Sequence, residues 1–119
     1  MSLEARLREQ LLPIVPVVKP QRYDGDALEY IVLRITVVPD LHAESQPRAF
    51  RCLVSVHWYL PLRLEAYPSE GINPLERKKQ IASAIRAAGC TWPSIEDASD
   101  DNGQHYVFEC EGMDDYGPA

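Results

Sequence analysis

The chain has 119 residues, of which 18 are acidic and 12 basic, so its formal net charge is −6 at pH 7. Its 45% hydrophobic and 25% charged residues are typical of one globular domain and exclude a disordered or fibrous chain. The last 24 residues hold eight acids and no Lys or Arg, which is the opposite of a nucleic-acid footprint. No apolar run approaches the roughly 20 residues of a membrane span. We therefore expect a protein partner, with no nucleic acid and no membrane.

The segment MSLEARLREQLLP lacks the basic leader and apolar core of a signal peptide, which predicts a cytoplasmic location. The three cysteines have unrelated spacings, which indicates reduced thiols rather than disulfides. Cys52 and Cys110 are expected as small buried hydrophobes on apolar strand faces. Cys90 follows a predicted helix end, which is expected to raise the pKa of its thiol.

A helix is predicted over residues 2–12, with Ser2 as its N-cap and Pro13 as its end. Its apolar stripe repeats at i, i+4 and i+8 and consists of Leu3, Leu7 and Leu11. Residues 14–20 are rich in valine and proline, so we expect an edge strand or an extended connector there.

Two long strands are predicted after a turn at residues 23–26, in which Gly25 is expected to take a positive φ. Apolar residues alternate over residues 29–38 and again over residues 48–60, which is the strand pattern. The polar connector over residues 39–47 has the length of a long hairpin loop. The two strands are therefore expected to pair antiparallel.

A second helix is predicted over residues 73–88, after the irregular residues 61–72. Asn73 is its expected N-cap, Pro74 its first residue and Gly89 its left-handed C-terminal residue. Its apolar side is expected to consist of Leu75, Ile81, Ala82, Ile85 and Ala88.

The chain is predicted to end in a β-hairpin. A short extended piece over residues 92–98 and a strand over residues 104–111 flank the pair Asn102-Gly103, which is a strong hairpin signal. Residues 112–119 are expected to form a flexible C-terminal tail.

These elements predict one α+β domain over residues 1–111 in the order α-β-β-(β)-α-β-β, with a mainly antiparallel sheet packed by two helices. The residues expected to share its core are Leu7, Leu33, Ile35, Val54, Val56, Ile81, Ile85 and Phe108.

Nothing in the sequence converges on a catalytic or metal site, so we expect no enzyme, no cofactor and no metal. His42, His57 and His105 fall in a loop and two separate strands, with no spacing typical of zinc ligands. His57 and His105 are expected to face solvent. Residues 97–103 resemble a calcium loop, but two main ligand positions are missing, and the turn interpretation is better.

The charge distribution suggests contacts between copies. The basic run Arg77, Lys78 and Lys79 is expected to form a solvated helix face, or else to meet the acids of a neighbouring copy. The acids Glu109 and Glu111 are placed for such an intersubunit pair. Together with apolar residues of the 61–72 loop, the candidate interface residues are Leu62, Leu64, Tyr67, Arg77, Lys78, Glu109 and Glu111.

Several stretches resemble the tail terminator, or tail completion, proteins of long-tailed bacteriophages and prophages. They are LEARLREQLLPIVPVV, YDGDALEYIVL, CLVSVHWYLPL and RAAGCTWPSIEDASDDNGQHYVFECEG, of which the last is the most specific. The resemblance covers nearly the whole chain, from Leu3 to about Glu111, and lies in element order and phrases rather than in a catalytic signature.

The resemblance implies a small α+β protein with a sheet flanked by two helices and no catalytic residues. In that family, copies assemble, typically as hexamers, into a ring that caps the tail tube and offers a surface to the head-tail connector protein. It thus implies three partners: further copies of the chain, the tail tube protein and the connector. The location would be the host cytoplasm during assembly and then the virion tail. The alternatives are another neck protein of the same particle and a monomeric small-molecule-binding or enzymatic domain.

Overall fold

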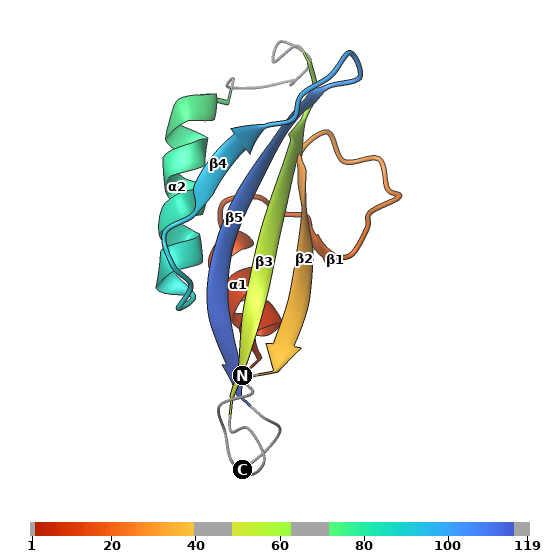
Figure 1. Ribbon diagram of the computed structural model, residues 1–119. Coiled ribbons are helices and arrows are strands. Elements are labelled where there is room, and N and C mark those ends of the chain that lie inside the picture. Colours follow the sequence, from red (N-terminus) through yellow and green to blue (C-terminus); the bar gives the residue numbers. More distant parts are fainter. Residues whose placement is uncertain (1, 40–48, 63–71, 116–119) are drawn as a thin grey trace.

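The computed structural model describes residues 2–39, 49–62 and 72–115, which form an α+β fold with two helices on one face of a five-stranded sheet (Figure 1). The helices and strands are α1 (Leu3–Leu11), β1 (Val18–Pro20), β2 (Tyr30–Pro39), β3 (Ala49–Leu60), α2 (Pro74–Ala87), β4 (Ser94–Asp97) and β5 (Gln104–Asp115). The strand order is β1-β2-β3-β5-β4. Among the strands of the described residues, β1 and β2 pair parallel and the other pairs are antiparallel. The predicted fold class and the antiparallel pairing of the two long strands are confirmed.

Helix α1 begins where the sequence predicts. The Ser2 hydroxyl accepts a hydrogen bond from the Ala5 amide at 3.1 Å, which satisfies one of the free amides of the first turn. The three leucines of its stripe are fully buried. A nine-residue helix is marginal by itself, so this packing against the sheet is what holds it.

The core lies between the helices and one face of the sheet. Alternate residues of β2, β3 and β5 point into it, and Trp58 and Phe108 are its largest fully buried side chains. Seven of the eight core residues predicted from the sequence belong to this cluster, and the eighth, Ile35, is partly buried and packs against it. Within the part of the chain that the structure describes, no helix is long and apolar enough to cross a membrane.

Helix α2 is capped as predicted, because Asn73 Oδ1 accepts hydrogen bonds from the amides of Leu75 and Glu76 at 3.1 and 3.2 Å. Gly89 has the expected left-handed conformation, with a φ of 99°. Leu75 was predicted to lie on the apolar side of this helix. That prediction is wrong, since its side chain is exposed. It precedes the buried Ile81 by six residues, which places it about 120° round the helix from the packed side.

Two glycines serve close packing rather than the predicted turn conformations. Gly25 does not have a positive φ; its bare Cα instead makes room for the Tyr23 ring, with which an added Cβ would collide. The hairpin loop consists of Asp101 and Asn102, while Gly103 pairs with Asp100. A Cβ on Gly103 would lie 2.8 Å from the Leu60 carbonyl oxygen, so glycine is required there by the neighbouring strand.

The predicted tail from residue 112 begins too early, because β5 continues to Asp115. Its last residues pair with the first residues of β3, from Gly112 opposite Cys52 to Asp115 opposite Ala49. Helix α1 also holds this end: the Leu3 amide donates to Asp114 at 3.2 Å, and Arg6 donates to the Met113 carbonyl at 2.8 Å. These partners are distant in sequence, so the residue pattern after Gly112 does not predict them.

Candidate interaction surface

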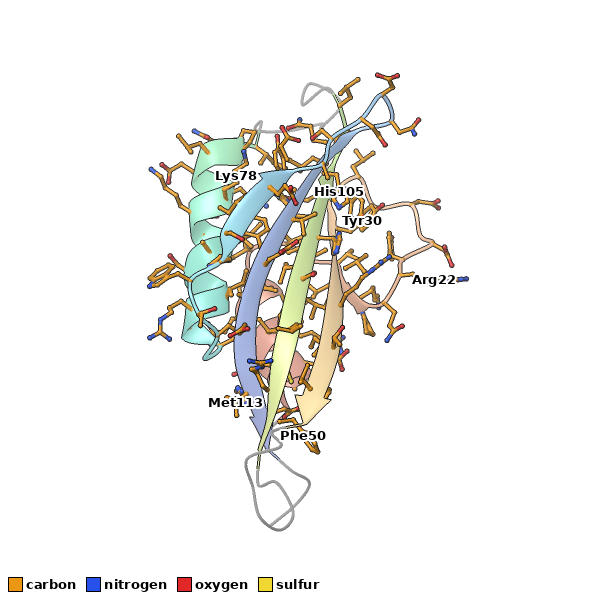
Figure 2. The ribbon with its side chains drawn as sticks, viewed as in Figure 1. Arg22, Tyr30, Phe50, Lys78, His105 and Met113 are labelled. Carbon is orange, nitrogen blue, oxygen red and sulfur yellow. The ribbon has the colours of Figure 1, made fainter. Side chains whose placement is uncertain are left out.

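Neither α1 nor α2 covers the face of the sheet opposite the core, which is turned toward the reader in Figure 1. Cross-strand pairing arranges its side chains in rows that run from β2 through β3 to β5. Three neighbouring rows are Arg34–Ser55–Glu109, Thr36–Leu53–Glu111 and Val38–Arg51–Met113. We call these nine residues the open face. Met113 lies at one end of the sheet, and Tyr30 and His105 lie toward the other (Figure 2).

The open face is electrically polarised across the strands. Its basic residues, Arg34 and Arg51, lie on β2 and β3, and its acidic residues, Glu109 and Glu111, lie on β5. All four are exposed. Arg34 and Glu109 are two strands apart, with roughly 10 Å between their backbones and Ser55 between them. Among the described residues, none of the four forms an ion pair.

Apolar side chains are exposed beside these charges. Trp92 is 65% exposed and Leu53 is 42% exposed, and both line a shallow hollow of about 700 Å³ that also includes Arg34 and Glu111. A large exposed aromatic residue next to arginines is the composition of an interaction hot spot. The sequence drew attention to Glu109 and Glu111 but not to Trp92, whose exposure depends on the course of the chain after α2.

The other end of the sheet carries a stack of aromatic rings. Tyr30 stacks on Tyr59 with ring centroids 4.7 Å apart, and Tyr59 stacks on His105 at 4.2 Å. His57 Nδ1 lies 2.9 Å from His105 Nε2, a hydrogen-bonding distance. Both histidines lie on the face of the sheet that points away from the core, as expected, but each is only partly exposed because they contact each other. They occupy diagonal positions on neighbouring antiparallel strands, where side chains on one face come into contact.

The two histidines are neutral at pH 7. Burial, followed by the neighbouring His105 and the positive charge of Arg34, lowers the pKa of His57 to about 4. Burial is also the main cause that lowers the pKa of His105, although Asp100 and Asp97 oppose it. Two neutral rings can form this hydrogen bond, because the N–H of one ring donates to the unprotonated nitrogen of the other.

A second hollow, of about 400 Å³, lies beside this stack. Its walls include Leu28, Tyr30, Tyr59, Gln104 and His105, and the 98–103 turn forms part of its rim. The hollow combines apolar surface with hydroxyl, amide and imidazole groups. It is open to solvent rather than enclosed.

Two basic residues of α2, Arg77 and Lys78, form contacts within the chain. Arg77 Nη1 donates to both carboxylate oxygens of Glu29 at 2.8 and 2.9 Å and to the Ile14 carbonyl at 2.9 Å. Trp58 Nε1 donates to the same carboxylate at 2.9 Å. Lys78 Nζ lies 3.9 Å from the centre of the Tyr106 ring, a cation–π contact. The expectation of a wholly solvated face is therefore wrong for Arg77 and Lys78, and their contact with the acids of a neighbouring copy stays a prediction.

Glu29 is a buried charged residue that no motif of the sequence singles out. Burial raises the pKa of Glu29 above its usual value, while the hydrogen bond from Trp58 and the charge of Arg77 lower it. The carboxylate joins the start of β2 to α2 across the core. Such a network positions elements and leaves its residues unavailable for a partner.

The loop residues of the predicted interface are only partly placed. Leu62 is exposed. Leu64 and Tyr67 lie outside the described residues, so the structure gives no position for them. Glu109 and Glu111 lie together on the open face, two residues apart on β5.

The cysteines are buried free thiols. Cys90 and Cys110 hydrogen-bond to each other, which lowers the pKa of the Cys90 thiol and raises that of Cys110. The pKa of Cys90 is lowered rather than raised as expected, because the hydrogen bond with Cys110 favours its thiolate. No group of three or more potential metal ligands occurs among the described residues.

Comparisons with known proteins bear on the fold. No protein-family model matches the chain, and no curated protein matches it. A solved structure of a protein whose name states no function has a TM-score of 0.59 and 15% sequence identity, and the match covers 98% of this chain and 92% of that chain. At this identity the likeness shows a common fold over nearly the full length and nothing of function.

Proposed function

We propose that the chain is a structural subunit of a bacteriophage or prophage tail: a tail terminator whose copies form a ring, typically of six, on the finished tail tube. The sequence stretches that resemble this family support the proposal. So does the architecture, because a sheet flanked by two helices is what the resemblance implies. In this role the chain is not an enzyme, and its partners are further copies, the tail tube protein and the head-tail connector protein.

The observation that carries the proposal is the open face. It presents charges of both signs that form no ion pair among the described residues, beside the exposed Trp92 and Leu53, whereas Arg77 and Lys78 of α2 already form contacts within the chain. A surface of this kind gains stability when another protein covers it and supplies the opposite charges. This role implies a location in the host cytoplasm during assembly and in the virion tail afterwards.

The polarity of the open face favours a ring over a symmetric dimer. Copies in a ring meet through two different surfaces, one complementary to the other, whereas a two-fold dimer uses the same surface twice. Basic residues toward the β2 side and acidic residues toward the β5 side provide two such surfaces.

The proposal is tested by assembly and by genetics. Sedimentation across a range of concentrations, with and without tail tube protein, is expected to reveal a closed oligomer. A phage or prophage that lacks the gene is expected to make tails of uncontrolled length. Tails of normal length would overturn the assignment, and tails of normal length that fail to join heads would indicate another neck protein of the same particle.

A second candidate function rests on the hollow beside Tyr30, Tyr59 and His105. Its mixture of apolar and polar groups suits a small planar molecule, which is the behaviour of a monomeric binding domain. This candidate predicts a strict monomer and ligand-dependent stabilisation in a thermal-shift screen of small aromatic compounds. A chain that assembles and is stabilised by no compound would exclude it.

A further inference from the structure

The two edges of the sheet have complementary features. Strand β1 pairs with β2 only from Ile31 to Leu33, so β2 from Arg34 to Pro39 has no described partner on its outer side. Strand β4 forms the opposite edge and likewise pairs only with β5. Unpaired strand edges are templates for another strand.

The hydrogen bonds identify which backbone groups are free on β2. The Ile31 amide donates to Val17, and the Leu33 carbonyl accepts from Gln21, so these residues direct their backbone groups outward. Because the direction alternates along a strand, Ile35 and Val37 also direct theirs outward, toward the uncovered edge. Pro39 has no amide to donate.

The same reasoning applies to β4. The Ala98 amide donates to the His105 carbonyl, which directs Ala98 toward β5, and Glu96 and Ser94 follow in the same direction. Ile95 and Asp97 therefore direct their backbone groups outward. Each edge thus offers two residues whose backbone donors and acceptors have no partner among the described residues.

We propose that β4 of one copy pairs antiparallel with β2 of the next copy, with Ile95 opposite Val37 and Asp97 opposite Ile35. This register uses all four outward-directed residues and requires no amide from Pro39. It rests on the proposed ring, for which it names the contact. Copies arranged in this way meet head to tail, as closure into a ring requires.

The side chains at the two edges fit this register. Val37 is 50% exposed and Ile95 is 45% exposed, although both point to the helix-covered side of the sheet. Pairing places these two apolar side chains beside each other on one face. On the other face, Glu96 comes opposite Thr36 and diagonal to Arg34, within reach of the long arginine side chain.

The charges allow this pairing and oppose the alternatives. The β4 edge carries Glu96 and Asp97, and the β2 side carries Lys19 and Arg34. Two β4 edges would bring like charges together, as would two β2 edges, and both arrangements are destabilised. Only β4 against β2 joins opposite charges.

The register also requires a shift along the strands. Within one copy Ser94 lies level with Arg34, whereas the proposed pairing brings Ser94 of the neighbour level with Val38. This is a displacement of four residues, roughly 13 Å. Sheets that close on themselves have tilted strands with a stagger of this kind.

The first test removes one backbone donor. Val37→Pro deletes an outward amide without affecting the bonds between β2 and β3, and Val37→Thr is the matched control, which keeps the amide and the branched shape. We expect Val37→Pro to abolish the oligomer and Val37→Thr to retain it, as measured by sedimentation, with circular dichroism confirming that each variant is folded. A Val37→Pro variant that is folded and still assembles would overturn the pairing.

The second test exchanges charges and does not depend on a proline. Arg34→Glu and Glu96→Arg are each expected to weaken association about tenfold, and the double variant is expected to restore it to within about threefold. A double variant that is as weak as the product of the single changes would overturn the contact between these two residues. A wild type that stays monomeric with tube protein overturns the ring itself, whereas wild-type rings unaffected by any of these changes overturn only the pairing.

Discussion

The two faces of the sheet are made from the same strands, yet they differ in almost every property. On the helix-covered face, Leu33, Val56 and Phe108 form one row and are almost fully buried. On the open face the adjacent row consists of Arg34, Ser55 and Glu109 and contacts solvent. Since successive residues of a strand point to opposite sides, a strand can supply stability through one face and recognition through the other. Substitutions on the two faces should therefore have separate consequences.

The largest expected effect is on the covered face. Phe108→Ala removes a fully buried ring and should lower the free energy of unfolding by about 3 to 5 kcal/mol. Leu53→Ala, on the open face, is the control and should change it by less than about 0.5 kcal/mol. Urea denaturation of the monomer measures both. Similar losses for the two variants would contradict the division between the faces.

The next effect concerns the network that joins the sheet to α2. Arg77→Ala leaves the buried Glu29 carboxylate with Trp58 as its remaining side-chain donor, and we expect a loss of about 3 kcal/mol. Lys79→Ala is the control, because the exposed Lys79 lies 3.7 Å from the exposed Glu76 and should contribute little. Equal midpoints for the two variants would show that the network does not stabilise the fold.

A smaller effect is expected at the start of α2. Asn73→Ala removes the acceptor of two amide hydrogen bonds and should cost about 0.5 to 2 kcal/mol. Asn73→Asp should be nearly neutral, because a carboxylate also accepts these bonds and suits the positive end of the helix dipole. Thermal denaturation compares the two. Equal losses would show that the side-chain acceptor is not what matters.

The histidine pair should produce a pH dependence rather than a loss at pH 7. Because the pKa of His57 in the folded chain, about 4, lies below its ordinary value of 6.5, the unfolded chain takes up the proton first as the pH falls. The contribution of this lowered pKa to the free energy of unfolding is fully present above about pH 6.5. It is lost progressively as the pH falls to about 4. We expect the wild type to lose more stability than His57→Gln between pH 7 and pH 4.5. A constant difference between the two would contradict this.

The smallest effect is expected for the acids of the open face. Glu109→Gln combined with Glu111→Gln should change the stability of the monomer by less than about 0.5 kcal/mol, since both side chains are exposed and form no ion pair with another described residue. Any effect on assembly should weaken as salt screens the charges. A large loss of monomer stability would show that these acids act within the chain.

Much of the fold could be predicted because its signals are local. The stripe of α1, the alternation of β2 and β3 and the cap at Asn73 each depend on residues close in sequence. The candidate surface was predictable only in part. Glu109 and Glu111 were identified from charge, but the contacts of Arg77 and Lys78 with Glu29 and Tyr106 could not be predicted, because these partners are distant in sequence.

The sequence by itself thus determined the kinds of element, their order and the composition of the core, because helix and strand periodicity follow from backbone geometry. Only the tertiary structure decided which charges remain free. It brought Glu29 beneath Arg77, placed His57 against His105 and extended β5 along β3 to Asp115. These contacts join residues that no local pattern relates, since they depend on which strands become neighbours and in which register.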